Sequence, residues 1–424
     1  MPNYGIGAGG QLGLAFEVLP PPVQSTPATA TTGGTITAGT YRLAITAVNA
    51  SGETIASNEL TIVTTGATST ITANWAAVTG ATSYKYYRSA AGGAIGTELF
   101  VATITAPTVT YVDTGTPTPA GALPTFNSAS NPGVYVAPTK FFPINSELLK
   151  YIQDTQFRRP IRKTPDVLGA VAGNAHTEGP ISGELLEDVL IYFLYASRYN
   201  IVKSGTTPNF IYTCTPSAVA IPVRTLSITV ERTAGVVFGY VGCIVKGFRI
   251  GIANGMVSYN VDILGTDEAS QPLPVPTWPT SVPFGVGTHN VEIPTGTPVF
   301  DTDAYEFGVD FNAVPEFRLK NTGRGAQFAR FGESNTTISL GRDFVDRADY
   351  DAFKALTSQS LTMAASRGTN NQFSIVAPVS LKNTYEVGLG GQGDLIRAAI
   401  TYQTMIDGSG NSHTLTVKTQ ENIT

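Results

Sequence analysis

The feature that most constrains this chain is an internal repeat in its latter part, because a repeated pattern predicts a repeated fold. The stretch 179–185 runs into an apolar periodic segment, and 337–343 runs into a second one. Further on, 245–265 resembles 381–407, each a strand, a glycine turn and a returning strand. We therefore predict one β fold written twice, with the boundary near the proline-rich run 271–283.

Two segments carry apolar residues at helical spacing, 182–199 and 346–357. Ser182 and Asp346 are residues of the kind that cap helix N termini, so each is expected to begin a helix. Most of the remainder alternates as strands do. Strands are expected at 226–232, 236–253, 257–264, 305–311, 316–319, 336–340, 372–376, 380–389 and 396–406.

Residues 19–130 differ from the rest, being rich in Thr, Ala, Gly and Pro and poor in charge. Short alternating runs separated by Gly, Asn and Asp predict a small β-sandwich, with Trp75 and Tyr86 as core anchors. The stretches 41–57 and 84–88 resemble those of immunoglobulin-like and fibronectin type III sandwiches. They occur here in the reverse of the usual fibronectin order.

Composition excludes several classes of protein. A formal net charge of −5 and a pI of about 5.3 argue against a folded surface that grips nucleic-acid phosphates. Two cysteines exclude a disulfide framework. Cys214 and Cys243 are expected to be reduced core thiols, and paired strands could make them neighbours. The N terminus shows no secretory signal pattern, and no apolar run is long enough to span a bilayer, so we expect no membrane partner.

No motif for catalysis, cofactor binding or metal binding has supporting context. The run 5–10 fits G-x-G-x-x-G but lacks the preceding strand and the helix of a dinucleotide site, which favours an interface arm. The histidines lack metal-ligand spacing. The oxygen-rich run 407–411 is interpreted as a hairpin turn rather than a calcium loop. The last group consists of acidic residues that could pair for acid–base chemistry, but we interpret them as a solvated face: Asp301, Asp303, Glu306 and Asp310.

The most suggestive charges lie in two basic segments, 157–165 and 320–331, which we interpret as irregular loops. One reading is that these are solvated surface. The other is contact with an acidic partner, and since this chain is itself acidic, another copy of it is one such partner. Exposed ion pairs are worth only ~0–1 kcal/mol each, so many would have to act together. The candidate inter-subunit contacts are Arg158, Arg159, Arg162, Lys163, Arg324 and Arg330.

The chain resembles the tail tube (major tail) proteins of long-tailed bacteriophages. The resemblance rests on the stretches 7–13, 141–149, 179–185, 242–248 and 257–268, and covers about 1–18 and 131–424. It implies a mainly β fold: two tandem tail-tube-type β-barrel or sandwich folds, each with one short helix, plus an inserted Ig-like sandwich. The expected domains are 1–18 (arm and first tube strand), 19–130 (inserted sandwich), 131–275 (tube fold copy 1) and 276–424 (copy 2).

The resemblance further implies a structural, non-enzymatic protein of a siphophage virion, assembled in the host cytoplasm, whose stacked rings form the conduit for DNA ejection. Two folds per chain predict rings of three chains with pseudo-sixfold symmetry; six chains is the runner-up. Implied partners are other copies of the chain, the tape measure protein and the terminator and tip proteins. Viral DNA would only pass through a net negative lumen, and residues 19–130 would project outward toward host-surface glycans. The alternative is an extracellular adhesin or surface-layer β protein that binds glycans.

Overall fold

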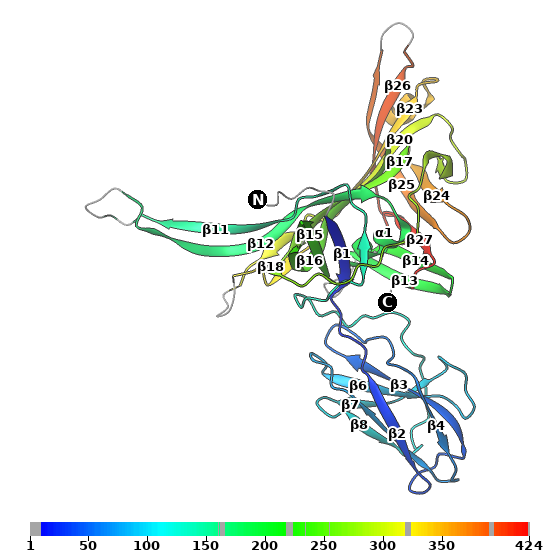
Figure 1. The fold of residues 1–424 in the computed structure, drawn as a ribbon. Helices are drawn as coiled ribbons and strands as arrows, with labels where there is room; N and C mark the ends of the chain where they lie inside the picture. Colours follow the sequence, from blue (N-terminus) through cyan, green and yellow to red (C-terminus); the bar gives the residue numbers. More distant parts are fainter. Residues whose placement is uncertain are drawn as a thin grey trace. The chain divides into compact units, whose positions relative to one another are not determined.

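The computed structural model describes residues 10–159, 161, 166–217, 224–233, 235–253, 255–318, 324–389 and 394–422. Most of the glycine-rich run 5–10 lies outside these residues. The described chain is mainly antiparallel β-sheet with two short α-helices, which confirms the predicted fold class (Figure 1). It divides into two compact units: Glu17–Pro132 forms one, and the residues before Glu17 and after Pro132 form the other.

The unit Glu17–Pro132 is a sandwich of two sheets around one apolar core. Trp75, Tyr84 and Tyr86 are buried in that core, as predicted for Trp75 and Tyr86. One sheet has the order β2 (Gln24–Ala30), β5 (Thr70–Trp75), β8 (Thr110–Asp113), and the other β4 (Leu60–Thr64), β3 (Gly39–Val48), β6 (Ser83–Arg88), β7 (Leu99–Thr105).

A tyrosine at the start of β3 helps to relate the two sandwich motifs in space. The Tyr41 hydroxyl donates a hydrogen bond to the carbonyl of Thr37, 3.1 Å away and just upstream. In immunoglobulin-type sandwiches such a tyrosine marks strand F, which lies in one sheet with strand C. Here β3 pairs with β6, the strand of the second motif, so the two strands are neighbours although their order along the chain is reversed.

The two ends of this unit lie side by side. After β8 the chain returns along the edge of β7, where Phe100 accepts and donates backbone hydrogen bonds with Ala120 and Gly121. The Leu19 N–H then donates to the Ala129 carbonyl at 2.9 Å, and the Asn131 N–H to the Glu17 carbonyl at 2.8 Å. Adjacent ends let such a unit occupy a single point in another fold's chain.

The other unit is organised around eight antiparallel strands, with the long strands β16 and β25 each contributing their second half. Across this sheet the order is β11 (Lys150–Arg158), β12 (Gly169–Glu184), β17 (Met256–Gly265), β16 (Val236–Ala253), β20 (Thr302–Asp310), β23 (Asn335–Asp343), β26 (Arg397–Thr404) and β25 (Gln372–Gly388).

The first halves of β16 and β25 leave this sheet and join two others. The first half of β16 pairs with β15 (Leu226–Thr233) and β18 (Asp267–Ser270), and β15 continues to β1 (Gln11–Phe16) and β9 (Lys140–Phe142). The first half of β25 pairs with β24 (Gln359–Ser366) and β27 (Thr414–Thr419), and these continue to β19 (His289–Glu292), β14 (Asn209–Pro216) and β13 (Tyr199–Thr206). The short elements are β10 (Ser146–Glu147), β21 (Val314–Glu316), β22 (Phe328–Arg330) and the 3-10 turn Val286–Thr288.

The same pattern of pairing thus occurs twice. The strands β1, β11, β12, β15, β16, β17 and β18 are matched in order and pairing by β19, β20, β23, β24, β25, β26 and β27. Both long strands carry a bulge where their second half begins, between Val245 and Gly247 and between Lys382 and Thr384. A helix follows the matching strands, α1 (Glu187–Tyr195) after β12 and α2 (Ala348–Lys354) after β23.

Both helices begin later than predicted. Ser182 does not cap α1; it lies in β12 opposite Asn260, because the ladder to β17 continues to Glu184. Leu186 stands at the N-cap without a side-chain hydrogen bond. In α2 the N-cap is Arg347, although the Asp346 carboxylate accepts the Ala348 N–H at 2.8 Å. The prediction of two helices was therefore right and their starts were wrong.

Three strand predictions also needed correction. The strands predicted at 372–376 and 380–389 are one strand, β25, because the bulge does not end the ladder. The strand predicted at 316–319 ends at Glu316, with Leu319 outside the described residues. The run 407–411 is a turn, but it closes no hairpin, since β26 and β27 pair with different halves of β25.

Cys214 and Cys243 are both buried and form no disulfide, as predicted. They are not neighbours on paired strands, however. Cys214 lies in β14 opposite Ile201 and Leu415, and Cys243 lies in β16 opposite Leu226. Burial raises the pKa of the Cys214 thiol to about 12, so this residue is an inert core thiol.

Candidate assembly site

The eight-stranded sheet has one apolar and one polar face, as the alternation of side chains along strands requires. Phe248, Ile250 and Phe307 are among those buried on the apolar face. Glycine, alanine and serine occupy much of the centre of the polar face, where a hollow of about 440 Å³ lies over five strands. Its lining includes Gly251, Ser258, Ala304, Ser339, Gly341 and Ala399.

The polar face carries more acidic than basic side chains. Two arginines on it have acidic neighbours: Arg249 Nε lies 3.5 Å from Glu306 Oε1, and Arg397 Nη1 lies 2.7 Å from Asp303 Oδ2. The acidic residues on this face are Glu178, Glu184, Asp262, Asp303, Glu306, Asp310, Asp343 and Glu386, and the basic ones are Lys150, Lys246, Arg249 and Arg397. Of the acidic residues considered at 301–310, Asp303, Glu306 and Asp310 are exposed in β20, and Asp301, just before it, forms an ion pair with Arg342.

Both outer strands of this sheet have an open edge. Among the described residues, β11 pairs with β12 alone and the second half of β25 pairs with β26 alone. Most of β11 is exposed, and so are Thr384, Glu386 and Val387 on β25. The matching half of β16 is instead covered by β20. An open edge presents unpaired N–H and C=O groups and is a template for another strand.

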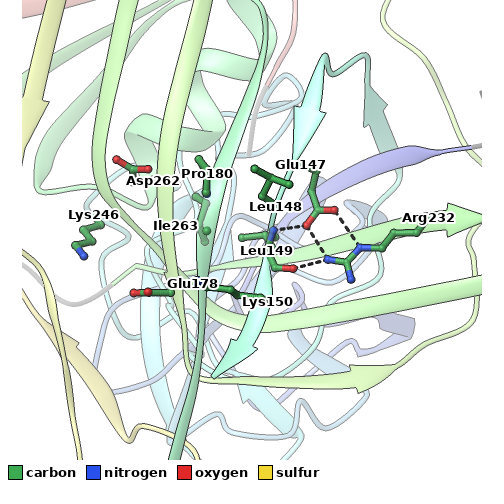
Figure 2. Close-up of a pocket in the computed structure, with 11 residues that line it drawn as sticks. Glu147, Leu148, Leu149, Lys150, Glu178, Pro180, Arg232, Lys246, Asp262 and Ile263 are labelled. Atoms are coloured by element: carbon green, nitrogen blue, oxygen red, sulfur yellow. Dashed lines mark hydrogen bonds and ion pairs between the residues drawn. The ribbon is translucent and has the colours of Figure 1, made fainter. Parts of the chain in front are cut away.

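Glu147 and Arg232 close one end of the β11 edge (Figure 2). The Glu147 carboxylate accepts hydrogen bonds from Arg232 Nη2 and Nε at 2.9 and 3.1 Å, and from the Leu149 N–H. Arg232 Nη2 also donates to the Leu149 carbonyl. Because these hydrogen bonds favour the charged form, they raise the pKa of Arg232 above its ordinary value. Both main-chain groups of Leu149 are thus occupied, and the open edge begins at Lys150.

A cavity of about 700 Å³ lies beside this pair, at the base of the β11–β12 hairpin. Figure 2 shows charged side chains of both signs around it, including Lys150, Glu178, Lys246 and Asp262. Its walls come from β10, β11, β12, β15, β16 and β17. Lys150, Glu178 and Asp262, which belong to the polar face, line it, so it lies on that side of the sheet next to the open edge. Neither a metal-ligand group nor a nucleophile with a base lines it.

The four predicted contact residues that the structure describes do not form one cluster. Arg158 ends β11 and exposed Arg159 follows it, so the segment read as an irregular loop is in part a strand. Arg162 and Lys163 lie outside the described residues. Arg324 approaches the same hairpin, where its Nη1 donates to Gln153 Oε1 at 2.8 Å. Arg330 lies in β22, where its Nε donates to Glu316 Oε1 at 2.7 Å.

Of the three histidines, His413 is buried in the core, His289 is partly buried, and the partly exposed His176 lies 3.8 Å from the Glu178 carboxylate. Burial lowers the pKa of His413 to about 3 and that of His289 to about 4. Each contacts a tyrosine hydroxyl, that of Tyr199 for His413 and that of Tyr305 for His289. In the part of the chain that the structure describes, no group of His, Cys, Asp and Glu could hold a metal ion.

Sequence reasoning missed the residues that define the edges. Glu147 and Arg232 are far apart in sequence, and no local pattern joins them. The repeat could have drawn attention to Glu386. It matches Arg249, whose strand is paired on both sides, so its own strand would be expected to need a second partner.

Comparison with known families gives a match over much of the chain. The family of the phage tail tube protein matches residues 109–404, which include the main strands of both repeats from β11 to β26. No curated protein matches the chain. No helix among the described residues is long and apolar enough to cross a membrane. Since one family match spans well over half of the sequence, the chain belongs to the phage tail tube protein family and is a structural protein of the virion tail.

Proposed function

We propose that this protein polymerises as stacked rings of three chains, each chain carrying two copies of the tube fold, with 131–275 in the first and 276–424 in the second. The observation that carries the proposal is the junction inside the chain: β20 of the second repeat pairs with β16 of the first. The same edge is open on β25, and the strand that matches β20, namely β11, is open at the other end. One chain thus contains one complete junction between two folds, β16 with β20. Its two open edges, on β25 and β11, are the two strands that a second junction of this kind would need.

The number of chains follows from counting folds. Six tube folds around a ring require three chains when each chain supplies two, which gives pseudo-sixfold symmetry. Joining open edges of neighbouring chains removes the exposed strand edges of every subunit, which is how closed sheets avoid aggregation. A ring of six chains would need twelve folds and a wider tube, and it is the competing arrangement.

The polar face of the eight-stranded sheet is the proposed lumen wall. Small side chains line much of the hollow at its centre, and its acidic residues outnumber the basic ones. Like charge repels DNA phosphates, whereas a basic wall would retain them. Viral DNA would therefore pass without being held, and the tube would serve as the conduit for its ejection.

The β11–β12 hairpin is the proposed contact between stacked rings, because a head-to-tail interface builds an open filament. Near its end the large apolar side chains of Phe157, Ile161 and Val171 are exposed, and exposed apolar groups of this kind mark interaction sites. Arg158, Arg159 and Arg324 add positive charge there. With Arg162, Lys163 and Arg330 they remain candidate inter-subunit contacts.

The sandwich Glu17–Pro132 is proposed to decorate the outside of the tube, since a domain of this size inside the lumen would block DNA. An outward domain suits a long non-contractile tail, and host-surface glycans are its proposed ligand class. The tape measure, terminator and tip proteins are the proposed further partners. We propose no enzymatic activity.

Electron microscopy of the purified full-length chain tests this function, with native mass spectrometry of disassembled rings. Tubes whose cross-sections have threefold symmetry, and rings that contain three chains, are expected. Monomers that never form tubes would contradict the assembly, and rings of six chains would contradict the stoichiometry.

A further inference from the structure

We propose that neighbouring chains join through one defined strand register: the second half of β25 in one chain pairs antiparallel with β11 of a second copy. In this register Thr384 lies opposite Ile152 and Glu386 lies opposite Lys150. The inference rests on the proposed function for the existence of a ring. It adds the register and the residues in contact.

The junction inside the chain supplies the template. Along it, Gly247 lies opposite Asp310 and Arg249 lies opposite Gly308. The bulges match β16 to β25 residue by residue, because Lys246 is the extra residue in the first and Asn383 the extra residue in the second. Gly247 therefore corresponds to Thr384, and Arg249 corresponds to Glu386.

The ladders next to the bulges match β11 to β20 in the same way. In the first repeat Asp262 of β17 lies opposite Gly247, the first residue after the bulge, and on its other side it lies opposite Pro180 of β12. In the second repeat Thr401 of β26 lies in the same way between Thr384 and Ser339 of β23.

Two residues earlier along each of these strands stand Glu178 and Thr337. Glu178 lies opposite Lys150, and Thr337 lies opposite Gly308. Lys150 therefore corresponds to Gly308, and Ile152 to Asp310. Transferring the in-chain pairs to these positions gives the proposed register without further assumption.

The side chains that this register brings together are complementary. Glu386 and Lys150 carry opposite charges on the polar face, and both are exposed in the single chain. On the other face Tyr385 meets Tyr151, and Val387 meets Leu149. Their in-chain counterparts are also apolar, Phe248 with Val309 and Ile250 with Phe307, and these four are buried.

A shift by one residue would destroy this match, because it moves every side chain of one strand to the opposite face. The charged Glu386 would then lie opposite Leu149 or Tyr151 instead of Lys150. The Glu147–Arg232 pair adds a second limit, since it occupies the main chain of Leu149 and ends the available ladder near Lys150.

Cysteine cross-linking tests the register. In assembled tubes of Ile152→Cys/Thr384→Cys, mild oxidation or a short bismaleimide is expected to link chains into covalent trimers. Residues directly opposite on paired strands have Cβ atoms about 4.5–5.5 Å apart, which is within reach of these links. The native cysteines are buried and give little background. The control Gln153→Cys/Thr384→Cys places the thiols on opposite faces and should link at least tenfold less.

Charge reversal provides an independent test. Lys150→Glu or Glu386→Lys alone should lower the yield of tubes several-fold, and the double variant should restore it. Lys354→Glu, in α2, is the matched control and should assemble normally. Circular dichroism and thermal melting of each variant identify any that fail to fold.

The outcomes separate this proposal from the one on which it rests. Rings of three chains that show no linkage at these positions, or that link equally well in the control, would overturn the register and leave the tube intact. Linkage at these positions into covalent hexamers would contradict the three-chain ring and support the register. Failure of the double charge variant to recover would count against the Glu386–Lys150 contact.

Discussion

The ammonium group of Lys382 lies 2.6 Å from the Asp349 carboxylate, and the lysine side chain is only 1% exposed. Asp349 also lies 2.6 Å from Nη1 of Arg342, so one carboxylate in α2 serves a cation from β25 and another from β23. No residue of α2 is itself buried. The position of this helix against the sheet therefore depends on Asp349 and on the rings of Tyr350 and Phe353, which contact Tyr385.

Replacing Asp349 by Ala is expected to destabilise the unit that holds the eight-stranded sheet, the larger of the two units, by about 3–5 kcal/mol. The reason is that the substitution leaves buried Lys382 without its counter-charge. Urea unfolding followed by tryptophan fluorescence and circular dichroism measures the change. Asp351→Ala is the control: its partner Arg347 is exposed, so a change within about 0.5 kcal/mol is expected. Equal effects of the two substitutions would show that Asp349 does not hold the helix.

The Glu147–Arg232 pair predicts a local effect on one amide. In Glu147→Ala the Leu149 N–H loses its acceptor, so hydrogen exchange there should speed up, with a loss of about 2 kcal/mol in local stability. Exchange measured residue by residue gives this directly. Glu178→Ala, a matched change in the neighbouring strand, should leave the Leu149 amide unchanged; unaltered exchange in both variants would disprove the role assigned to Glu147.

Buried histidines predict that the larger unit loses stability in acid. The pKa of His413, about 3, and that of His289, about 4, lie below the ordinary 6.5 because of burial. Below pH 6.5 the unfolded chain takes up protons that the folded chain does not, so stability is present above pH 6.5 and falls as the pH falls. At pH 5 the buried His413 should cost about 2 kcal/mol, and the only partly buried His289 should cost less because water screens its charge.

Urea unfolding at pH 7 and pH 5 checks this dependence. His413→Asn should weaken it by at least about half, even if it also lowers stability at both pH values. A His413→Asn chain with the full acid loss of the wild type would contradict the assignment.

The sandwich unit should respond to pH in the opposite direction. Burial, and then the neighbouring Glu59 carboxylate, raise the pKa of Glu98 to about 7. Above the ordinary 4.5 the unfolded chain loses this proton while the folded chain keeps it, so stability falls as the pH rises toward 7. The melting transition of Glu17–Pro132 should therefore move to lower temperature between pH 5 and pH 8. Glu98→Gln should flatten that shift, whereas Glu333→Gln in the other unit should not.

Deletion of residues 20–130 tests whether the sandwich is separable. The chain enters and leaves that unit at adjacent points, so joining Leu19 to Asn131 should leave the larger unit folded, with tubes visible by electron microscopy. A matched deletion inside the larger unit, of the strands β13 and β14, should abolish folding, because β14 pairs with β27. Loss of tubes in the first variant with folding intact would show that the sandwich takes part in assembly.

Much of the fold could be predicted where burial leaves a pattern. The bounds of β16 were predicted correctly at 236–253, because its alternating apolar residues pack against other strands. Within β11, in contrast, Lys150, Gln153 and Phe157 are all exposed, so neither face of the strand gives an apolar stripe to detect. The start of α1 was misjudged because Ser182 has cap chemistry, while a long-range ladder to Asn260 decides its conformation. The Glu147–Arg232 pair depends on tertiary proximity alone.

The paired ends of the sandwich have a consequence for how such a chain can change. Two backbone hydrogen bonds, from Leu19 to Ala129 and from Asn131 to Glu17, make the junction a single crossing point. A different domain inserted between those positions should change the unit that holds the eight-stranded sheet little, provided that the two termini of the inserted domain lie close together. The junction is thus a suitable insertion site for other domains. A binding module, an enzyme or a fluorescent reporter inserted there would occur once per chain, at regular intervals along an assembled tail.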